Sequence, residues 1–430
     1  MPRENEARST GQVAVTAMNA DVRRILLAQA LRAAAYGFGA VLLGASLEAR
    51  GWSSGRVGLL FTAVVAGTAL MSVLVGTTAD RIGRRRTYVG LFVGMAAAGA
   101  VFALSDRFWA LALVALSGTL STEVVESGPF TSLEQAMLPS GLRGQAPARA
   151  FGVYNAVATI AGSAGALAAG GPALLRDAFG GLPADQRFLL VFVPAGLLGA
   201  VVGSTLSRGV EAASTGHPGP PLRRSRSTVF RLGGLFAVDS FAGGFVVQSF
   251  LAYWFRAKFG VCVELLGLVF FAAGILQAGS FMVASRLAER FGLLNTMVFT
   301  HLPSNLLLAA VPLAPSFPTA IALLLGRYAL SQMDVPTRQA YITALVDPEE
   351  RTAAAAYTNS ARYLTRPLGP ALAGVSQQVA LGLPFFLGGG IKVAYDLALW
   401  SWFRRVPIEA GAGAAPGARR RSPTRHAGRV

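Results

Sequence analysis

The stretch "GTTADRIGRRRTYVG" (Gly76–Gly90) sets one aspartate and four arginines between two long apolar runs. The chain around it is 53% hydrophobic and only 14% charged, with a mean hydropathy of +0.51. A soluble protein needs about 25% charged residues to cover its surface. Even a chain of 430 residues cannot bury this much apolar surface in its own core, so we expect a lipid bilayer to solvate its exterior.

The positions of the basic residues indicate membrane topology. The formal net charge of +17 and the pI of about 11.2 are values that also suit a nucleic-acid-binding protein. Here, however, the arginines lie in short turns between apolar runs and at both ends of the chain, as the positive-inside rule requires. We therefore predict a lipid-embedded protein with no nucleic-acid partner.

Apolar stretches of the length of a membrane helix, about 20 residues, recur along the whole chain. Twelve are found, near residues 22–46, 57–79, 87–105, 108–128, 150–172, 187–206, 229–253, 265–285, 293–313, 317–337, 353–376 and 383–403. Alternate connections are rich in arginine, which places both termini in the cytoplasm. We predict a monomer of the plasma membrane with a cytoplasmic segment over 1–21, six-helix bundles over 22–206 and 229–405, a cytoplasmic linker over 207–228 and a disordered basic tail over 406–430.

The two halves resemble each other in sequence. "ADRIG" at 79–83 returns as "AERFG" at 288–292, a separation of 209 residues. Gln135 and Asn155 return as Gln339 and Asn359, a separation of 204 residues. Several such matches in the same order predict a duplicated six-helix unit, and the two copies run parallel because six spans return the chain to its starting side.

The charged turn between the second and third spans resembles the signature of the major facilitator superfamily of secondary transporters. The matching residues are Gly76, Ala79, Asp80, Arg81, Gly83, Arg84 and Arg85, and the sequence departs from the family at Thr78, where leucine is common. This resemblance implies an all-α membrane protein with twelve transmembrane helices in two pseudo-symmetric six-helix bundles. It also implies alternating access to a central cavity lined by the first, fourth, seventh and tenth helices.

The same resemblance implies a gate at the cytoplasmic face. Asp80 is expected near the N-terminus of the eleventh helix, where its charge meets unpaired backbone N–H groups. The stretch "DPEERT" predicts Asp347 as the N-cap of that helix and Glu350 as its capping-box acid. The expected counter-charges of Arg81, Arg84 and Arg85 are Asp347, Glu349 and Glu350. A turn that serves only as a topology signal is the alternative.

Four charged residues fall deep inside predicted spans, where ionisable groups are costly and usually functional. Arg32 and Asp239 are repeat-equivalent at a separation of 207 residues, and Glu123 and Arg327 at 204. We expect Arg32 near Glu123 or Glu126, and Asp239 near Arg327 or an arginine of the eleventh helix. Glu126 is either a proton carrier, because a low dielectric favours the protonated carboxyl, or part of a permanent ion pair.

A polar stripe runs along the eleventh helix. Asn359, Arg362 and Arg366 follow one another at helical spacing, and such a stripe suits an anionic solute or a carboxylate partner. Arg362 can alternatively extend to the aqueous boundary. Lys392 and Asp396, four residues apart in the last span, are expected to pair with each other.

The sequence shows no sign of catalysis. Its only cysteine, Cys262, excludes an intrachain disulfide and a thiolate metal cluster, and His217, His301 and His426 lack metal-ligand spacing. No phosphate-binding loop, zinc-protease helix or nucleophile elbow is present. We predict neither an enzyme nor a metal or other cofactor.

Taken together, these features favour a secondary transporter that exports a small organic solute in exchange for protons. Two alternatives remain open, a uniporter or importer of an organic anion that uses Arg362 and Arg366, and a membrane sensor on the same scaffold that does not transport.

Overall fold

The computed structural model describes residues 2–121, 128–138, 146–179, 185–211, 222–347 and 350–406, which form helices and connections without any strand. The N-terminal half consists of α1 (Pro2–Ala49), α2 (Ser54–Ile82), α3 (Arg84–Leu104), α4 (Phe108–Ala115), α5 (Pro129–Met137), α6 (Ala146–Ala168), α7 (Gly171–Phe179), η1 (Asp185–Val191), α8 (Phe192–Ser204) and η2 (Arg208–Glu211).

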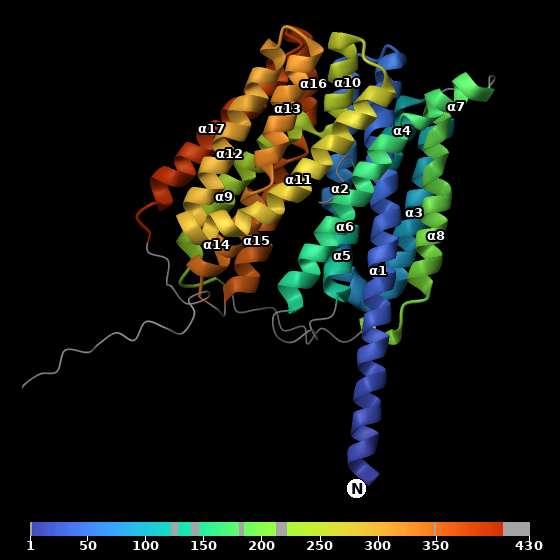
Figure 1. Cartoon of the computed structure of the whole chain (residues 1–430), viewed down its shortest axis with the longest axis vertical. Helices are drawn as coiled ribbons and strands as arrows, with labels where there is room; N and C mark the ends of the chain where they lie inside the picture. Colours follow the sequence, from blue (N-terminus) through green and yellow to red (C-terminus); the bar gives the residue numbers. More distant parts are fainter. Residues whose placement is uncertain are drawn as a thin grey trace, which may run out of the picture.

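The C-terminal half consists of α9 (Arg226–Gly243), η3 (Gly244–Val246), α10 (Gln248–Phe259), α11 (Val263–Phe291), α12 (Leu293–Ala310), η4 (Val311–Leu313), α13 (Phe317–Ser331), α14 (Asp334–Leu345), α15 (Arg351–Thr365), α16 (Leu368–Val379) and α17 (Leu383–Phe403). The halves stand side by side, with α12 and α17 on one flank and α3 and α8 on the other (Figure 1).

Eight segments of the described residues are long and apolar enough to cross a membrane. They coincide with the first three predicted spans and with the fifth to the ninth. The fourth, tenth and eleventh spans are each divided between two helices, and the twelfth forms α17. In the eleventh, Pro367 lies at the division, and a proline inside a helix removes a backbone hydrogen bond.

The seventh span bends at η3, and this bend meets the division of the eleventh span. A Cβ on Gly244 would lie 2.5 Å from the carbonyl oxygen of Arg366, and a Cβ on Gly369 would lie 2.5 Å from the Cα of Gly244. Only glycine on both sides permits so close an approach of two backbones. The two bends therefore pack α9 and η3 closely against α15 and α16.

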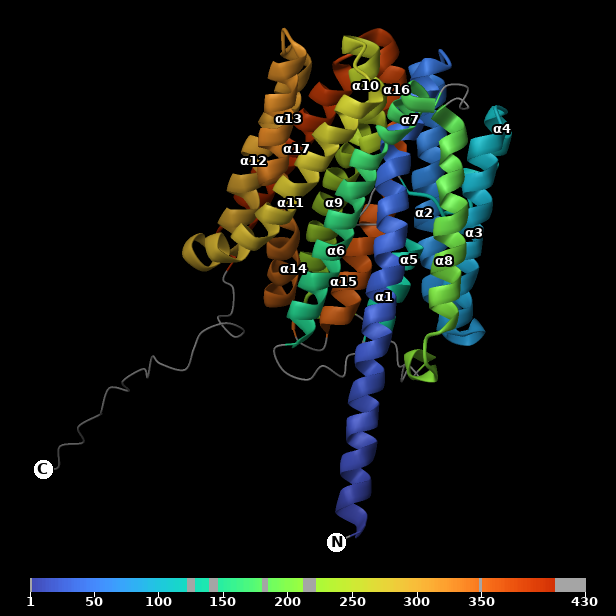
Figure 2. The same cartoon turned by 45° about the vertical axis from the view of Figure 1, so that its right-hand side comes forward.

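The two halves meet at one end of the bundle. We call the end at the α2–α3 turn (Ile82–Arg84) the motif end and the opposite end the far end; α1 begins at the motif end (Figure 2). Between the halves, α1 packs on α10, α2 on α16 and α6 on α11. Close approaches join Gly44 to Ser249, Gly58 to Gly374 and Gly267 to Ala166, all in the far-end parts of their spans.

Polar contacts strengthen this closure. Arg256 on α10 forms an ion pair with Glu48 on α1 at 2.9 Å, and the Tyr253 hydroxyl donates to the Trp52 carbonyl at 3.0 Å. On the other seam, the Ser54 hydroxyl donates to the carbonyl of Gly374 at 3.1 Å. The structure is thus a conformation closed at the far end.

Candidate functional site

In the N-terminal half, buried side chains from four helices gather around one carboxylate. Glu134 on α5 accepts hydrogen bonds from Arg32 on α1 at 2.7 Å, from Tyr88 on α3 at 2.7 Å and from Tyr154 on α6 at 2.5 Å. Arg32 also lies over the Phe130 ring, 5.0 Å from its centroid. Arg32 and Glu134 are both 0% exposed. We call Arg32, Glu134, Tyr88 and Tyr154 the N-terminal cluster; it is a buried ion pair whose carboxylate oxygens are both hydrogen-bonded.

The C-terminal half carries a larger buried group of ionisable side chains, which we call the C-terminal cluster. Its members are Asp239, His301, Asp334, Arg338, Lys392 and Asp396, each at most 7% exposed. Lys392 Nζ donates to Asp239 at 2.5 Å, and Arg338 donates to Asp334 at 2.9 Å. A second contact of Arg338, at 3.7 Å, reaches the other oxygen of Asp239.

His301 lies between two of the carboxylates of this cluster. Its Nδ1 is 2.8 Å from Asp396 Oδ1, and its Nε2 is 3.9 Å from Asp239 Oδ1. Asn305, one turn further along α12, donates to the second oxygen of Asp396 at 2.9 Å. The imidazole can therefore hold a proton against either carboxylate, on α9 or on α17.

The two clusters contain ion pairs at equivalent positions of the two halves, with the signs of the charges exchanged. Arg32 and Asp239 are repeat-equivalent at a separation of 207 residues, and Glu134 and Arg338 at 204. Each half thus joins its first helix to its fourth by an ion pair, and cation and anion have exchanged places. This inversion was expected from the sequence, but the partners were not.

The predicted partners need correction. Asp239 contacts Lys392, Arg338 and His301, so its predicted pairing with Arg327 or an arginine of the eleventh helix is wrong. The predicted pair of Lys392 and Asp396 is also wrong, since Asp396 contacts His301 instead.

Arg32 binds Glu134, a residue that was not predicted as its partner. Its predicted partners, Glu123 and Glu126, lie outside the described residues. A signal for the correct pairs was present in the repeat. "EQA" at 134–136 aligns with "RQA" at 338–340 at the separation of 204 residues, and the glutamine of each triplet directly follows the missed charge.

At the motif end, the side chains and backbone of the charged α2–α3 turn form hydrogen bonds with other residues of the N-terminal half. Gly83 has a φ of +105° between α2 and α3, a value that favours glycine. Arg84 donates to Asp80 at 2.7 Å, and Glu211 accepts the backbone N–H groups of Arg84 and Arg85 at 2.7 and 3.0 Å. Arg85 also donates to the carbonyl of Leu206.

The predicted acidic partners of this turn bind elsewhere. Glu350 accepts the backbone N–H groups of Arg223, Arg224 and Ser225, between 2.7 and 3.0 Å. These hydrogen bonds stabilise the carboxylate and lower the pKa of Glu350 to about 2. Asp347 lies 4.0 Å from Arg224.

The capping box predicted for the eleventh helix falls partly on residues 348–349, outside the described residues, and the part that assigns Glu350 as its acid was wrong. The N-cap residue of α15 is Glu350 rather than Asp347, and its side chain makes no capping hydrogen bond to α15. That carboxylate is already occupied by the backbone at the start of α9. Neither acid contacts Arg84 in this conformation, in which Arg84 binds Asp80 and the carbonyl of Ala136.

The remaining candidates lie along α13 and α15. Arg327 is half-buried, with its guanidinium 5.0 Å from the Tyr328 ring centroid. Asn359 is exposed on α15, whereas Arg362 and Arg366, in the last turn and at the C-cap of that helix, are half-buried. None of these four residues is among the members of the C-terminal cluster defined above.

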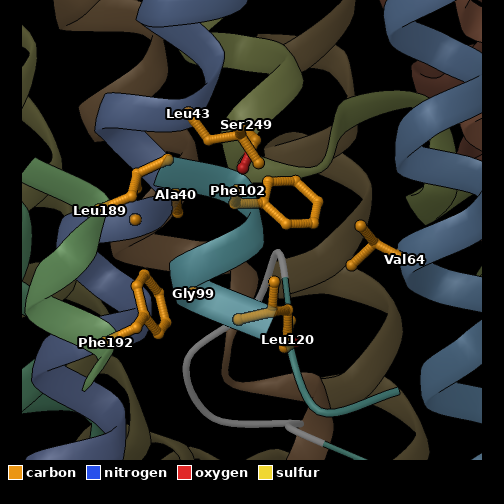
Figure 3. Close-up of a pocket in the computed structure, with 11 residues that line it drawn as sticks. Ala40, Leu43, Val64, Gly99, Phe102, Leu120, Leu189, Phe192 and Ser249 are labelled. Atoms are coloured by element: carbon orange, nitrogen blue, oxygen red, sulfur yellow. The ribbon is translucent and has the colours of Figure 1, made fainter. Parts of the chain in front are cut away.

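A small apolar void lies in the N-terminal half next to the far-end closure. Figure 3 shows Ala40, Val64, Phe102 and Phe192 around it, with the Ser249 side chain from α10 on one side. Its volume of about 20 Å³ holds one water molecule but no organic solute. The void is therefore a packing feature of the closed far end.

Known proteins share this architecture. A family model for the Major Facilitator Superfamily matches residues 25–370. The chain is 26% identical over 423 residues to the uncharacterized membrane protein YJR124C of Saccharomyces cerevisiae, covering 90% of this chain and 94% of the yeast protein.

Solved structures show the same fold at low identity. The nucleoside transporter NupG matches with a TM-score of 0.68 at 14% identity, over 89% of this chain and 99% of that one. The D-xylose-proton symporter matches with a TM-score of 0.67 at 13% identity, over 88% and 97% of the two chains.

A bacterial homologue of the human lysosomal transporter Spinster, in an inward-facing and unoccupied conformation, matches with a TM-score of 0.64 at 17% identity, over 89% and 95%. The chain belongs to the Major Facilitator Superfamily of membrane transporters. It is a multi-pass membrane transporter and not an enzyme.

Proposed function

We propose that this transporter couples the export of a small organic solute to proton entry across the plasma membrane, by alternating access. In this proposal the motif end and both termini face the cytoplasm, and the chain acts as a monomer. The observation that carries the proposal is the charge balance of the C-terminal cluster.

That cluster contains three carboxylates and two basic side chains, Arg338 and Lys392, together with His301. Without a further proton its formal charge is −1, and with one proton on the His301–Asp396 pair it is zero. An uncompensated charge away from water is costly, so the cluster favours binding one proton. The proton belongs to the pair and not to one residue, since the two side chains are in direct contact.

The cluster also has a mechanical connection to the far-end closure. When His301 is protonated, its Nε2–H attracts Asp239 in competition with Lys392. Asp239 lies on α9, which continues through η3 into α10, where Arg256 binds Glu48 of the other half. A shift of α9 relative to α17 therefore reaches the contact that closes the far end.

At the motif end we propose that closure occurs in the opposite conformation. Asp80, Arg81, Arg84 and Arg85 would then meet the start of α15, near Asp347 and Glu350. The contacts that compete with this arrangement are those of Arg84 with Asp80 and of Glu350 with the start of α9. Gly76 and Gly83 permit the close approach that such closure needs.

For solute binding, the candidates are the half-buried Arg327 on α13 and Arg362 and Arg366 on α15, together with Asn359 on α15. Glu123 and Glu126 stay candidates from the sequence alone. Guanidinium groups suit carboxylate or phosphate oxygens. An anion among the tested solutes is therefore expected to be recognised.

The test is solute-driven proton movement in proteoliposomes loaded with a pH dye, using a panel of sugars, nucleosides, amines and carboxylates. With an active solute we expect a pH change in the lumen, and its sign shows whether the solute and the proton move in opposite directions. His301→Gln should abolish the pH change but retain exchange of labelled solute for unlabelled solute. His217→Gln and His426→Gln are matched controls that should behave as the parent.

Other outcomes separate the alternatives. Full solute-driven proton flux in His301→Gln contradicts the proposed site. Solute flux that ignores the pH gradient indicates a uniporter, whereas binding without any flux indicates a sensor.

A further inference from the structure

Three buried hydroxyl groups near the C-terminal cluster lack hydrogen-bond partners among the residues that the structure describes. They are Thr296 Oγ1, Tyr341 Oη and Tyr395 Oη. Their side chains are 3%, 0% and 2% exposed. Nearly all buried hydroxyls in proteins bond to protein or to ordered water, so each of these hydroxyls is a site where a buried water molecule can bind.

The three residues that carry these hydroxyls lie at different depths between the motif end and His301. Tyr341 is four residues from the end of α14 at Leu345, and Thr296 is three residues from the start of α12 at Leu293. At about 1.5 Å per residue, Thr296 lies about 4.5 Å and Tyr341 about 6 Å from the end of its helix. Tyr395 is eight residues from the end of α17 at Phe403, which corresponds to about 12 Å.

Ring contacts fix the two ends of this series. The Tyr341 ring packs against Phe403, the last residue of α17, with centroids 6.3 Å apart. The Tyr395 ring stands edge-on to the His301 imidazole, with centroids 6.1 Å apart. Between these contacts, Tyr341 and Tyr395 belong to one buried cluster with Met297.

We propose that Thr296, Tyr341 and Tyr395, bridged by buried water, form a proton path between the motif end and the His301–Asp396 pair. This inference rests on the proposed proton coupling and deepens it by naming the route. Each hydroxyl accepts one proton on its oxygen and passes its own to the next oxygen. After one passage the hydroxyls are unchanged, and the proton released by the pair resides on water at the motif end.

Several charged groups set the protonation of His301 at the inner end of this path. Asp396 and Lys392 face it from α17, Asp239 from α9, and Arg338 and Asp334 from α14. On its own helix only the amide of Asn305 contacts it, among the described residues. The path itself runs inside the C-terminal half and does not use the seam between the halves, so it carries protons whether or not a solute is bound.

The experiment uses the full chain in nanodiscs with His217→Gln and His426→Gln, which leave His301 as the only histidine. Isotope-labelled imidazole is followed by infrared absorption after photolysis of a caged proton. We expect Tyr341→Phe and Tyr395→Phe to slow protonation of His301 about tenfold or more, with an unchanged final level, since each removes one oxygen from the relay and keeps the ring. Tyr357→Phe, in the motif-end part of α15, is the matched control and should leave the rate unchanged.

The possible results separate this inference from the proposed function. If both tyrosine variants protonate His301 at the parent rate, the path is refuted while proton coupling stands. The imidazole is essentially all protonated below about pH 4 and all neutral above about pH 9. If the protonation of His301 in the parent does not change between these two pH values, the proposed function itself fails. Thr296→Val gives an independent test of the same path, since it removes the hydroxyl at nearly constant volume, and a parent rate in this variant also counts against the path.

Discussion

Replacing Glu134 by Gln should destabilise the protein far more than its small change in size suggests. The substitution keeps the shape of the side chain but removes its charge. Arg32, which is 0% exposed and bonded to Glu134 at 2.7 Å, then loses this carboxylate in the interior. The amide also replaces one acceptor oxygen by a donor nitrogen, which cannot accept from Tyr88 or Tyr154.

The expected magnitude follows from what is left behind. Removing one partner of a buried ion pair costs about 3–5 kcal/mol, because the other charge stays desolvated. Replacing both partners by apolar residues of similar size avoids that penalty. The double variant Arg32→Met with Glu134→Leu should therefore be closer to the parent than either single variant, giving a favourable coupling energy of about 2 kcal/mol or more in a double-mutant cycle.

The assay is reversible unfolding in mixed micelles for the parent, the two single variants and the double variant. A loss below about 1 kcal/mol for Glu134→Gln, the range of an exposed pair, would refute the assignment of this site as a buried anchor. Additive losses in the cycle would show that Arg32 and Glu134 do not act as a unit.

Three further predictions concern the other half and the two ends. Asp239→Asn leaves Asp334 and Asp396 balanced by two cations, so we expect a loss of less than about 3 kcal/mol and no solute-driven pH change in proteoliposomes. Glu48→Gln removes the half-exposed ion pair with Arg256, which should change stability by less than about 1 kcal/mol but speed maleimide labelling of a cysteine placed at Ser249. The pKa of Glu350 falls from 4.5 to about 2 on folding, so its stabilising effect is complete above pH 4.5 and is lost as the pH falls toward 2. The difference in melting temperature between parent and Glu350→Gln should shrink over that range.

The fold was predictable because its signals are local. A bilayer demands long apolar helices, and the matches between the two halves identify the duplication. The divisions of the fourth, tenth and eleventh spans were not predictable in the same way. An apolar run does not show where a helix is interrupted when neighbouring helices satisfy the freed backbone groups. The approach of Gly244 to Gly369 is such a case, because it depends on contact between spans far apart in sequence.

The candidate site was predicted in part, and two of the missed partners share one cause. Depth in the membrane correctly marked Arg32 and Asp239 as buried charges. Glu134 and Arg338 were missed because the predicted fourth span ended at 128 and the tenth at 337, whereas α5 extends to Met137 and α14 to Leu345. Glu134 and Arg338 therefore fell outside the regions searched for buried charges. Hydropathy locates the apolar part of a span but not a polar helix end that the bundle covers. Lys392 and His301 lay inside predicted spans, and their contacts with Asp239 depend on the packing of helices far apart in sequence.

The two halves differ at the position of the histidine. Phe92 stands at the repeat position of His301, 209 residues earlier, and packs against Tyr88 and Phe130. Next to its ring lies Gly199, where a Cβ would approach the ring atoms to 2.3 Å. An aromatic ring packed against a glycine thus takes the place of the His301 imidazole in the N-terminal half. Among the described residues, the N-terminal cluster pairs one cation with one anion, whereas the odd number of carboxylates in the C-terminal cluster makes the neutrality of that cluster depend on a proton.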